Sequence, residues 1–334
     1  MSDQPTLTEV AAAAGVSPAT ASRVLTGTVR VSTSARRQVH DAIAQLGYVR
    51  RRAQRHAPQR TNQHTIAAVI CEPTTRLFHD PFFPRLLNGA EEALARHGTP
   101  LLMVSATPTN APHVTSYLLA GGVAAALLVS AHGRHPLAIS LPASRIAVRS
   151  AGRLPAGIDV PFVDVDNRDG ARQAVEHLLL RGRRSIAMIA GPPDLTAAAD
   201  RLIGYRHAME AAGRSAAPVA YGDFTHVSGA HAMGWLLNRM PRLDAVFVAS
   251  DLMATGAIQT LNRAGRRVPD DVAVVGFDDA PLARMVTPAL TTVRQPVEEL
   301  GSIAADLLFA TASGQDVEHH SPILPTELVV RDSS

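Results

Sequence analysis

The first 48 residues show the spacing of three short amphipathic helices. Apolar residues recur at intervals of three and four through residues 7–14, which places them on one face of a helix. Thr6 and Glu9 have the spacing of a capping box at the start of this helix, and Gly15 suits its end because glycine tolerates a positive φ. We therefore expect a first helix that ends at a glycine.

A second helix is expected to begin almost at once. Ser17 is placed to cap it, with Pro18 at the first helical position, where its missing amide is harmless. A third helix is expected from Ser32 or Ser34, carried by apolar positions at 39, 43 and 46. Two helices separated by a tight Gly-Val-Ser turn form a helix-turn-helix, an arrangement typical of DNA-binding proteins.

From residue 65 the pattern changes to apolar runs that alternate with helical stretches. Strands are expected at 65–71, 100–104, 123–129, 145–149, 161–165, 185–191, 217–222, 245–250 and 272–277, and helices at 84–97, 111–120, 168–181, 200–212, 227–239 and 252–264. Continuous apolar strands separated by helices indicate parallel sheets covered on both faces. The predicted class is therefore an all-α head followed by a two-lobed α/β body with two parallel sheets.

The polar, arginine-rich stretch between these parts predicts the domain boundaries. We expect a head at residues 1–49, a hinge at 50–64 and a body at 65–334. Within the body, the first lobe is expected to comprise about 65–162 and 292–320, and the second about 163–291 and 321–332. The length of 334 residues agrees with two or three such units.

Composition and charge limit the cellular compartment and the kind of binding partner that can be expected. The single cysteine, Cys71, excludes an internal disulfide, and no apolar run approaches the ~20 residues of a membrane span. The start lacks the features of a secretion signal, so a cytoplasmic protein without a membrane partner is expected. Residues 1–60 hold nine arginines against three acids, whereas the remainder is slightly acidic. A basic head on an acidic body indicates that the head meets phosphates.

Polar residues at the ends of the predicted strands are candidates for a ligand pocket. Ligands of open parallel sheets bind beyond the carboxyl ends of the strands. The residues at these positions are Ser130, Arg149, Asp164, Asp166, Ser250, Asp251 and Asp278. Any one of them could instead cap a helix or form a turn, and Asp251 in particular could cap the following helix.

Several ordered motifs together resemble one family. They are TLTEVAAAAGVSPATASRVL at 6–25, DPFFPRLLNGAEEALARHG at 80–98, VDVDNRDGARQAVEHLLLRGRRSIAMIAGP at 163–192, RLIGY at 201–205, ASDLMATGA at 249–257 and VPDDVAVVGFDDAPLARMVTPALTTVRQP at 268–296. The chain is similar to bacterial transcription regulators of the lactose and galactose repressor family. The resemblance implies a homodimer, rather than a tetramer, that binds double-stranded operator DNA. It also implies that the two-lobed body is similar to a periplasmic sugar-binding protein and holds a small effector.

The resemblance also implies the residues that meet DNA. Pro18 and Ala19 would read bases through apolar contact, and Arg23 could bind guanine in a bidentate manner. The other implied DNA contacts, mostly to phosphates, are Thr6, Ser17, Thr20, Ser22, Thr26, Arg30, Ser32, Tyr48, Arg51 and Ala57. Base contact and phosphate contact remain alternatives for Arg23.

The hinge departs from the family pattern. Arg50 stands where proline is common, and Ala57 where the family has a leucine that wedges into the minor groove. Alanine offers little apolar volume to unstack a base step, so weaker kinking of the operator is expected. The arginines at 50, 51, 52 and 55 would instead contribute phosphate contacts and a strong salt dependence.

In the body, the resemblance implies an effector site with an aromatic face. Phe82 and Phe83 would form an apolar platform. Arg201 would hold a ligand hydroxyl or carboxylate, and Asp278 would accept hydrogen bonds from two hydroxyls. Phe224 stands where purine-responsive relatives have a stacking ring. The other candidate effector contacts are the strand-end residues Ser130, Arg149, Asp166 and Ser250. Leu195 stands where purine-responsive relatives have an arginine, so a sugar-like effector is favoured. No cofactor or metal is implied.

The sequence argues against two other classes of function. The sequence has no Walker loop, HExxH motif, nucleophile elbow or paired cysteines, which argues against an enzyme. A secreted sugar-binding protein would not explain the basic head. The favoured function is a repressor of carbohydrate-related genes that is released by a sugar-like effector, and a non-sugar effector or a corepressor remains the alternative.

Overall fold

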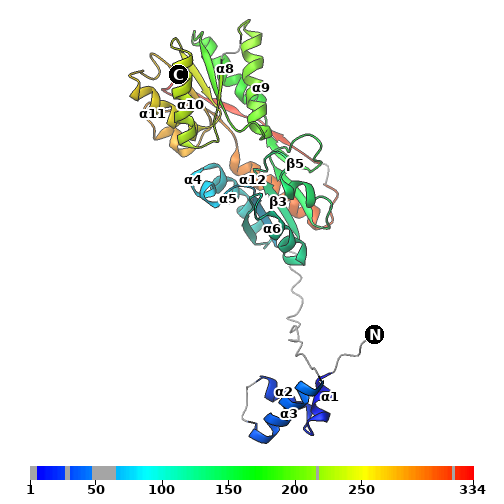
Figure 1. The fold of residues 1–334 in the computed structure, drawn as a ribbon. Helices are drawn as coiled ribbons and strands as arrows, with labels where there is room; N and C mark the ends of the chain where they lie inside the picture. Colours follow the sequence, from blue (N-terminus) through cyan, green and yellow to red (C-terminus); the bar gives the residue numbers. More distant parts are fainter. Residues whose placement is uncertain (1–5, 27–30, 47–64, 216–217, 318–319) are drawn as a thin grey trace. The chain divides into compact units, whose positions relative to one another are not determined.

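The structure is a computed structural model that describes residues 6–26, 31–46, 65–215, 218–317 and 320–334, although not the side chains of Leu25 and Thr26. The chain divides into two units, a head at residues 1–60 and a body at residues 61–334. The hinge predicted at 50–64 and both of its boundaries fall outside the described residues. The two units are therefore described separately (Figure 1).

The head contains the three predicted helices, α1 (Leu7–Ala13), α2 (Pro18–Thr26) and α3 (Thr33–Leu46). The predicted capping box is present, because the side chains of Thr6 and Glu9 each accept a hydrogen bond from the backbone amide of the other. Gly15 has the positive φ that a helix end requires, at 61°. Ser17 Oγ accepts from the Thr20 amide at 3.2 Å, so it caps α2 as predicted. The local signals in the sequence thus account for the start of α2 and for both ends of α1.

A small apolar core joins the three helices. Val10, Ala21 and Val39 are fully buried and come from α1, α2 and α3 respectively. Leu46, expected to carry the inward face of α3, is 38% exposed and lies outside this core. The core is made largely of alanine and valine, which lets the helices pack closely.

The first lobe of the body is a six-stranded sheet. Its strands lie in the order β11-β5-β4-β3-β1-β2, and all the neighbouring pairs are parallel. They are β1 (Ile66–Ile70), β2 (Leu101–Ser105), β3 (Ala125–Val129), β4 (Ala147–Ala151), β5 (Phe162–Val165) and β11 (Ile323–Leu324). The helical segments of this lobe are α4 (Thr74–His79), α5 (Phe82–Ala95), α6 (Ala111–Tyr117), η1 (Leu118–Gly122), α7 (Pro136–Ser140) and α12 (Val297–Ala312).

Both faces of this sheet are covered, as the continuous apolar strands predicted. Ile66 and Ala68 of β1 pack with α5 and α12, whereas Ala67 and Val69 pack with α6 and α7. Side chains alternate between the two faces of a strand, so a strand buried on both sides must be apolar throughout. All five residues of β1 are buried.

The second lobe repeats this plan with a second six-stranded sheet. Its order is β12-β10-β9-β8-β6-β7, parallel except for β12, which is antiparallel to β10. The strands are β6 (Ile186–Ala190), β7 (Val219–Tyr221), β8 (Ala245–Val248), β9 (Ala273–Asp278), β10 (Thr291–Arg294) and β12 (Glu327–Val329). The helices are α8 (Asn167–Leu180), α9 (Thr196–Ala211), α10 (His226–Arg239), α11 (Asp251–Arg263) and η2 (Pro281–Arg284).

The strand pairing corrects the predicted lobe boundaries. Strand β5 was expected in the second lobe but pairs with β4 of the first, and β11, expected in the second lobe, pairs with β5. Strand β10 was expected in the first lobe but pairs with β9 of the second. The chain therefore crosses between the lobes after β5, after β10 and after β11. Each strand pairs before the chain crosses, which places the crossings a few residues later than predicted.

Some elements differ from the sequence-based expectation in extent. Helix α9 begins at Thr196 instead of residue 200, and β4 continues to Ala151 instead of ending at residue 149. The short helices α4 and α7 and the long helix α12 were not among the expected elements. None of the helices in the described part of the chain combines the length and apolar character needed to cross a bilayer.

Glycine lets each main helix pair of the body pack with backbones in close contact. A Cβ atom placed on Gly89 of α5 would lie 1.9 Å from the carbonyl oxygen of Glu298 in α12. The same construction on Gly229 of α10 puts the Cβ 2.2 Å from the carbonyl oxygen of Met253 in α11. Both distances are far below van der Waals contact, so the helices would have to separate to admit a side chain.

We expect Gly229→Ala to lower the free energy of unfolding by about 1–3 kcal/mol, because the new methyl group overpacks the α10–α11 contact. Gly234 lies on the same helix, and its Cβ would meet only Thr260 Cγ2, at 4.0 Å. Gly234→Ala should therefore raise stability by roughly 0.5–1 kcal/mol through helix propensity. Urea unfolding of both variants measures the contrast, and equal effects would disprove the close-packing explanation.

Candidate functional site

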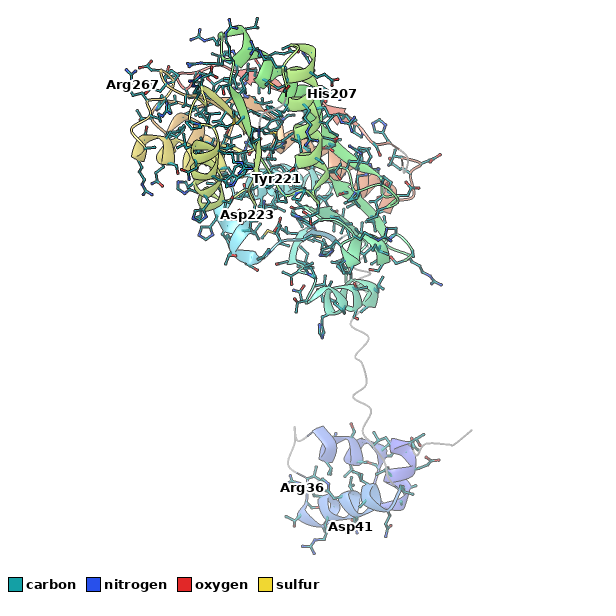
Figure 2. All side chains as sticks on the ribbon, turned by 45° about the horizontal axis from the view of Figure 1, so that its top comes forward. Arg36, Asp41, His207, Tyr221, Asp223 and Arg267 are labelled. Atoms are coloured by element: carbon teal, nitrogen blue, oxygen red, sulfur yellow. The ribbon has the colours of Figure 1, made fainter. Side chains whose placement is uncertain are left out.

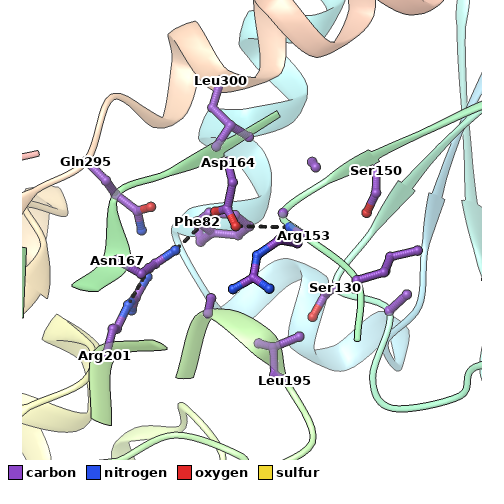
Figure 3. Close-up of a pocket in the computed structure, with 15 residues that line it drawn as sticks. Phe82, Ser130, Ser150, Arg153, Asp164, Asn167, Leu195, Arg201, Gln295 and Leu300 are labelled. Atoms are coloured by element: carbon purple, nitrogen blue, oxygen red, sulfur yellow. Dashed lines mark hydrogen bonds between the residues drawn. The ribbon is translucent and has the colours of Figure 1, made fainter. Parts of the chain in front are cut away.

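A cleft between the two lobes lies at the carboxyl ends of the strands, where ligands of parallel sheets bind. It contains two adjoining chambers that are lined by polar and aromatic side chains. The first chamber is lined on its polar side by Ser130, Ser150, Arg153, Asp164, Asn167, Arg201 and Gln295 (Figure 3). The second is lined by Arg76, Asp80, Phe82, Phe83, Ser130, Arg201, Phe224, Ser250, Asp278 and Gln295, among others. Phe82, Ser130, Arg201 and Gln295 line both chambers, so the two chambers form one continuous site.

Arg201, in the first turns of α9, organises the wall that the second lobe contributes. Its guanidinium donates to Asn167 Oδ1 at 2.9 Å and to the Ala249 carbonyl at 2.6 Å, and it lies 3.7 Å from the centre of the Phe277 ring. Burial lowers the pKa of Arg201, and the carboxylate of Asp278, 3.7 Å away, opposes that decrease. The guanidinium thereby joins the start of α8 to the ends of β8 and β9.

Asp278 ends β9 in a conformation that few residues other than glycine adopt, with φ of 118°. Gln295 Nε2 donates to its Oδ1 at 2.5 Å. Burial raises the pKa of Asp278, although Arg201 opposes the rise. Asp251, buried nearby, accepts from Thr292 Oγ1 at 2.5 Å and from the Ala280 amide at 2.8 Å. Asp251 thus supports the turn that presents Asp278.

On the first-lobe side, Asp164 is occupied by structural hydrogen bonds. Its carboxylate accepts from the Arg153 amide and from Asn167 Nδ2 (Figure 3), and also from the Val165 amide. Burial raises the pKa of Asp164, and these amide donors lower it. Asp164 therefore positions Asn167 and the Arg153 segment along the chamber wall.

Ser150 presents a polar atom that the fold itself leaves unused. Its hydroxyl is buried and has no hydrogen-bond partner, and the residue lines the first chamber. A buried hydroxyl without a partner costs free energy, so this position suits a ligand hydroxyl.

Aromatic rings form the apolar part of the second chamber. Phe82 and Phe83 meet edge to face, with centroids 5.5 Å apart. Phe224 enters from the second lobe with φ of 66°, and the Arg76 guanidinium lies 5.3 Å from the centre of its ring. The chamber thus offers apolar ring surface beside charged groups, the combination that pyranose sugars require.

A histidine clasp joins the two lobes at the rim. His132 Nε2 lies 2.8 Å from Glu72 Oε1 of the same lobe, and Nδ1 lies 3.1 Å from Asp194 Oδ1 of the other. Both ring nitrogens can donate only when the imidazole is protonated. Burial lowers the pKa of His132, but the hydrogen bonds to Glu72 and Asp194 outweigh it, so the pKa lies above its ordinary value.

Further polar contacts bridge the lobes around the clasp. The Gly133 amide donates to the Asp194 carbonyl at 2.9 Å. Arg153 of the first lobe pairs with Asp200 of the second, and Arg85 Nη1 donates to the Asp278 carbonyl at 3.1 Å. The structure therefore shows the cleft with its lobes in contact.

The structure brings together seven of the nine predicted effector residues, namely Phe82, Phe83, Ser130, Arg201, Phe224, Ser250 and Asp278. Arg149 does not line the cleft. It is buried in β4, where it donates to the carbonyls of Val317 and His320. Asp166 is exposed and caps α8 by accepting from the Asp169 amide. Ser250 caps α11 as well as facing the cleft.

Sequence reasoning missed several lining residues. Strand β4 ends two residues later than predicted, so Ser150 lies within the strand, and Arg153 follows its true end. Gln295 follows β10, which was not predicted because its sequence, TTVR, is too polar to give the signal of a buried strand. Arg76 and Asp80 belong to or follow α4, which is too short to show a helical period.

The head presents part of its predicted DNA-contacting set. Pro18, Ala19 and Arg23 are exposed on α2. Thr6, Ser17, Thr20, Ser22 and Ser32 are exposed or half-buried, and Arg36, with Asp41, lies on α3 (Figure 2). The side chain of Thr26 and all of Arg30, Tyr48, Arg51 and Ala57 fall outside the described residues. In the described part of the chain, no group of three or more His, Cys, Asp or Glu side chains is arranged to hold a metal.

Comparison with known proteins identifies the family. Residues 6–51 match the family described as bacterial regulatory proteins, lacI family, and residues 175–334 match the periplasmic binding protein-like domain. The transcriptional regulator CelR of Thermobifida fusca is 42% identical over 99% of this chain and 98% of its own. The repressor CytR of Escherichia coli K12 is 32% identical over 98% of this chain and 96% of its own.

Solved structures agree over the full length. The CelR–cellobiose complex superposes with a TM-score of 0.80 at 41% identity, covering 99% of this chain and 100% of that one. The lac repressor dimer bound to operator and the anti-inducer ONPF gives a TM-score of 0.73 at 26% identity, covering 99% of each chain. The chain therefore belongs to the lacI family of bacterial transcription regulators.

Proposed function

We propose that this regulator binds its operator as a homodimer and releases it when a β-linked glucose disaccharide such as cellobiose occupies the cleft. The observation that carries the proposal is the cleft itself, which combines an aromatic face, a buried arginine and an unpartnered serine hydroxyl. The 41% identical relative whose solved structure is a cellobiose complex supports this choice of sugar.

The groups of the cleft suit different parts of a sugar. The ring of Phe82 borders both chambers and can pack against the C–H face of a pyranose. Arg201 and Gln295 can donate to hydroxyl oxygens, and Asp278 can accept from hydroxyls. Because these groups belong to different lobes, a sugar that contacts all of them favours the closed cleft.

In the head, α2 is proposed to enter the major groove. Pro18 and Ala19 would contact thymine methyl groups, and Arg23 would contact a guanine or a phosphate. Their exposure on one helix supports this role.

Exposed apolar side chains on the body support dimer formation. Phe78 and Met103 are 78% and 61% exposed and border a groove on the first lobe, and Met285 is 81% exposed on the second. Large exposed apolar residues on both lobes are expected where a second copy packs. Movement of the lobes would then change the spacing of the two heads and reduce operator affinity.

The proposal predicts specific DNA binding that a sugar reverses. Full-length protein should bind a fragment from upstream of its own gene with a Kd of about 10⁻⁸–10⁻¹¹ M. Cellobiose should weaken this binding at least about tenfold, whereas sucrose should leave it unchanged. Fluorescence anisotropy measures both effects. Absence of specific binding with and without each sugar would refute the regulator proposal, and tighter binding with cellobiose would instead indicate a corepressor.

Ser150→Ala should separate ligand binding from stability. Removing a buried, unpartnered hydroxyl should leave the melting temperature unchanged or raise it, but should weaken cellobiose binding about two- to tenfold. Ser144 is the matched control, because its hydroxyl is already paired, donating to the Leu141 carbonyl at 2.6 Å. Ser144→Ala should lower the melting temperature and leave cellobiose affinity unchanged. Unaltered affinity in Ser150→Ala would show that this hydroxyl does not contact the sugar.

Effector affinity should depend on pH through His132. The pKa of His132 is raised, so the charged clasp is fully formed below its ordinary pKa and is lost as the pH rises through the raised value. Cellobiose affinity measured by calorimetry should therefore fall between about pH 6 and pH 8. His132→Gln cannot ionise and should lack this component of the pH profile. Identical profiles for the two proteins would mean that the clasp does not contribute to closure.

A further inference from the structure

A third cavity lies against the second chamber of the cleft. This partly open cavity is called the outer chamber. Arg76, Asp80 and Phe224 line both the outer chamber and the second chamber. Because the two cavities share these residues, a ligand that fills the second chamber can extend past them without leaving the protein surface.

The two walls of the outer chamber differ in chemistry. The first-lobe wall, from α4, is polar and contains Thr75, Arg76 and His79. The second-lobe wall contains the apolar side chains of Phe224, Val227 and Leu252, together with Thr225 and His226. Val227 is 60% exposed at the start of α10. One apolar wall facing one hydrogen-bonding wall matches a pyranose ring, which has an apolar C–H face and an edge of hydroxyls.

The partition between the two chambers is held rigidly. Phe224 has a left-handed backbone, and its ring packs so closely over Gly191 that a Cβ there would lie 2.3 Å from the ring. Asp223, labelled in Figure 2, fixes the turn by accepting from the Thr225 amide at 3.0 Å and from its hydroxyl at 2.6 Å. Strained residues held by their surroundings are concentrated at ligand sites. The ring therefore offers a fixed edge between the chambers.

We propose that the outer chamber is an additional sugar subsite and that the preferred effector is a β-linked glucose oligomer longer than a disaccharide. The inference rests on the proposed function, because it places a disaccharide in the two inner chambers. The third unit packs its C–H face on Val227 and Leu252 and directs hydroxyls to Arg76 and His79. The regulator then distinguishes cellotriose from cellobiose by contacts outside the inner cleft.

Calorimetric titration of the full-length protein with cellobiose and cellotriose tests the subsite. Cellotriose should bind about tenfold more tightly, roughly the contribution of one additional packed group. Val227→Asp should abolish this gain and leave cellobiose affinity unchanged. An acidic residue in the first turn of a helix is favourable, so this variant should fold normally. Val330, 57% exposed on the same lobe, provides the control, and Val330→Asp should retain the gain.

Each remaining outcome identifies what is wrong. If cellobiose binds and releases the operator but cellotriose binds no more tightly, the subsite is refuted and the proposed function stands. If cellotriose binds more tightly and Val227→Asp retains the gain, the third unit lies elsewhere and the outer chamber is refuted. If neither sugar binds while specific DNA binding persists, both the subsite and the proposed effector class are wrong.

Discussion

The buried guanidinium of Arg201 is the constraint on which the rest of the cleft depends. A buried cation is costly unless charges and hydrogen bonds surround it. Here Asn167, the Ala249 carbonyl and Asp278 supply them from three separate elements, and the Phe277 ring lies beneath. Because these partners come from α8, β8 and β9, the same interaction that neutralises the cation also fixes the second-lobe wall of the site.

The lobes themselves are suited to move as rigid bodies. Each has its own apolar core, and the described contacts across the cleft are mainly polar, including the His132 clasp, the Arg153–Asp200 pair and the Gly133–Asp194 hydrogen bond. Polar contacts can exchange with water, whereas opening either core would expose apolar surface. Closure can therefore depend on a modest ligand contribution, which is what a reversible regulator requires.

Much of the fold could be predicted because local signals and global packing agree. The Thr6–Glu9 capping box, Gly15 and the fully apolar strands each have one physical explanation, and the structure confirms them. The lobe boundaries were wrong because β5 and β10 are short and partly polar and β11 has only two residues, so that only the strand pairing assigns them to a sheet. The residue composition of a strand next to a lobe crossing does not indicate which of the two sheets the strand joins.

The site was harder to predict for two reasons: side chains alternate between the two faces of a strand, and residues of the same type at strand ends have different roles. Neighbouring residues in a strand face opposite sides. Ser150 therefore lines the cleft, although the adjacent Arg149 points into the interior. Asp166 and Asp278 are both acids at the ends of strands, but Asp166 caps a helix and Asp278 faces the cleft. Phe82, Arg201 and Asp278, which the family motifs implied, line the cleft, because the family pattern carries three-dimensional information that periodicity lacks.

The central claim is that effector binding in the cleft closes the two lobes. Hydrogen exchange at the Gly133 amide tests it most directly, because this amide donates across the lobes to Asp194. Saturation with cellobiose should slow exchange at Gly133 by about tenfold or more, while Ala126, in the core of β3, should be unaffected. If cellobiose is shown to bind but exchange at Gly133 is unchanged, binding does not close the cleft and the account is wrong.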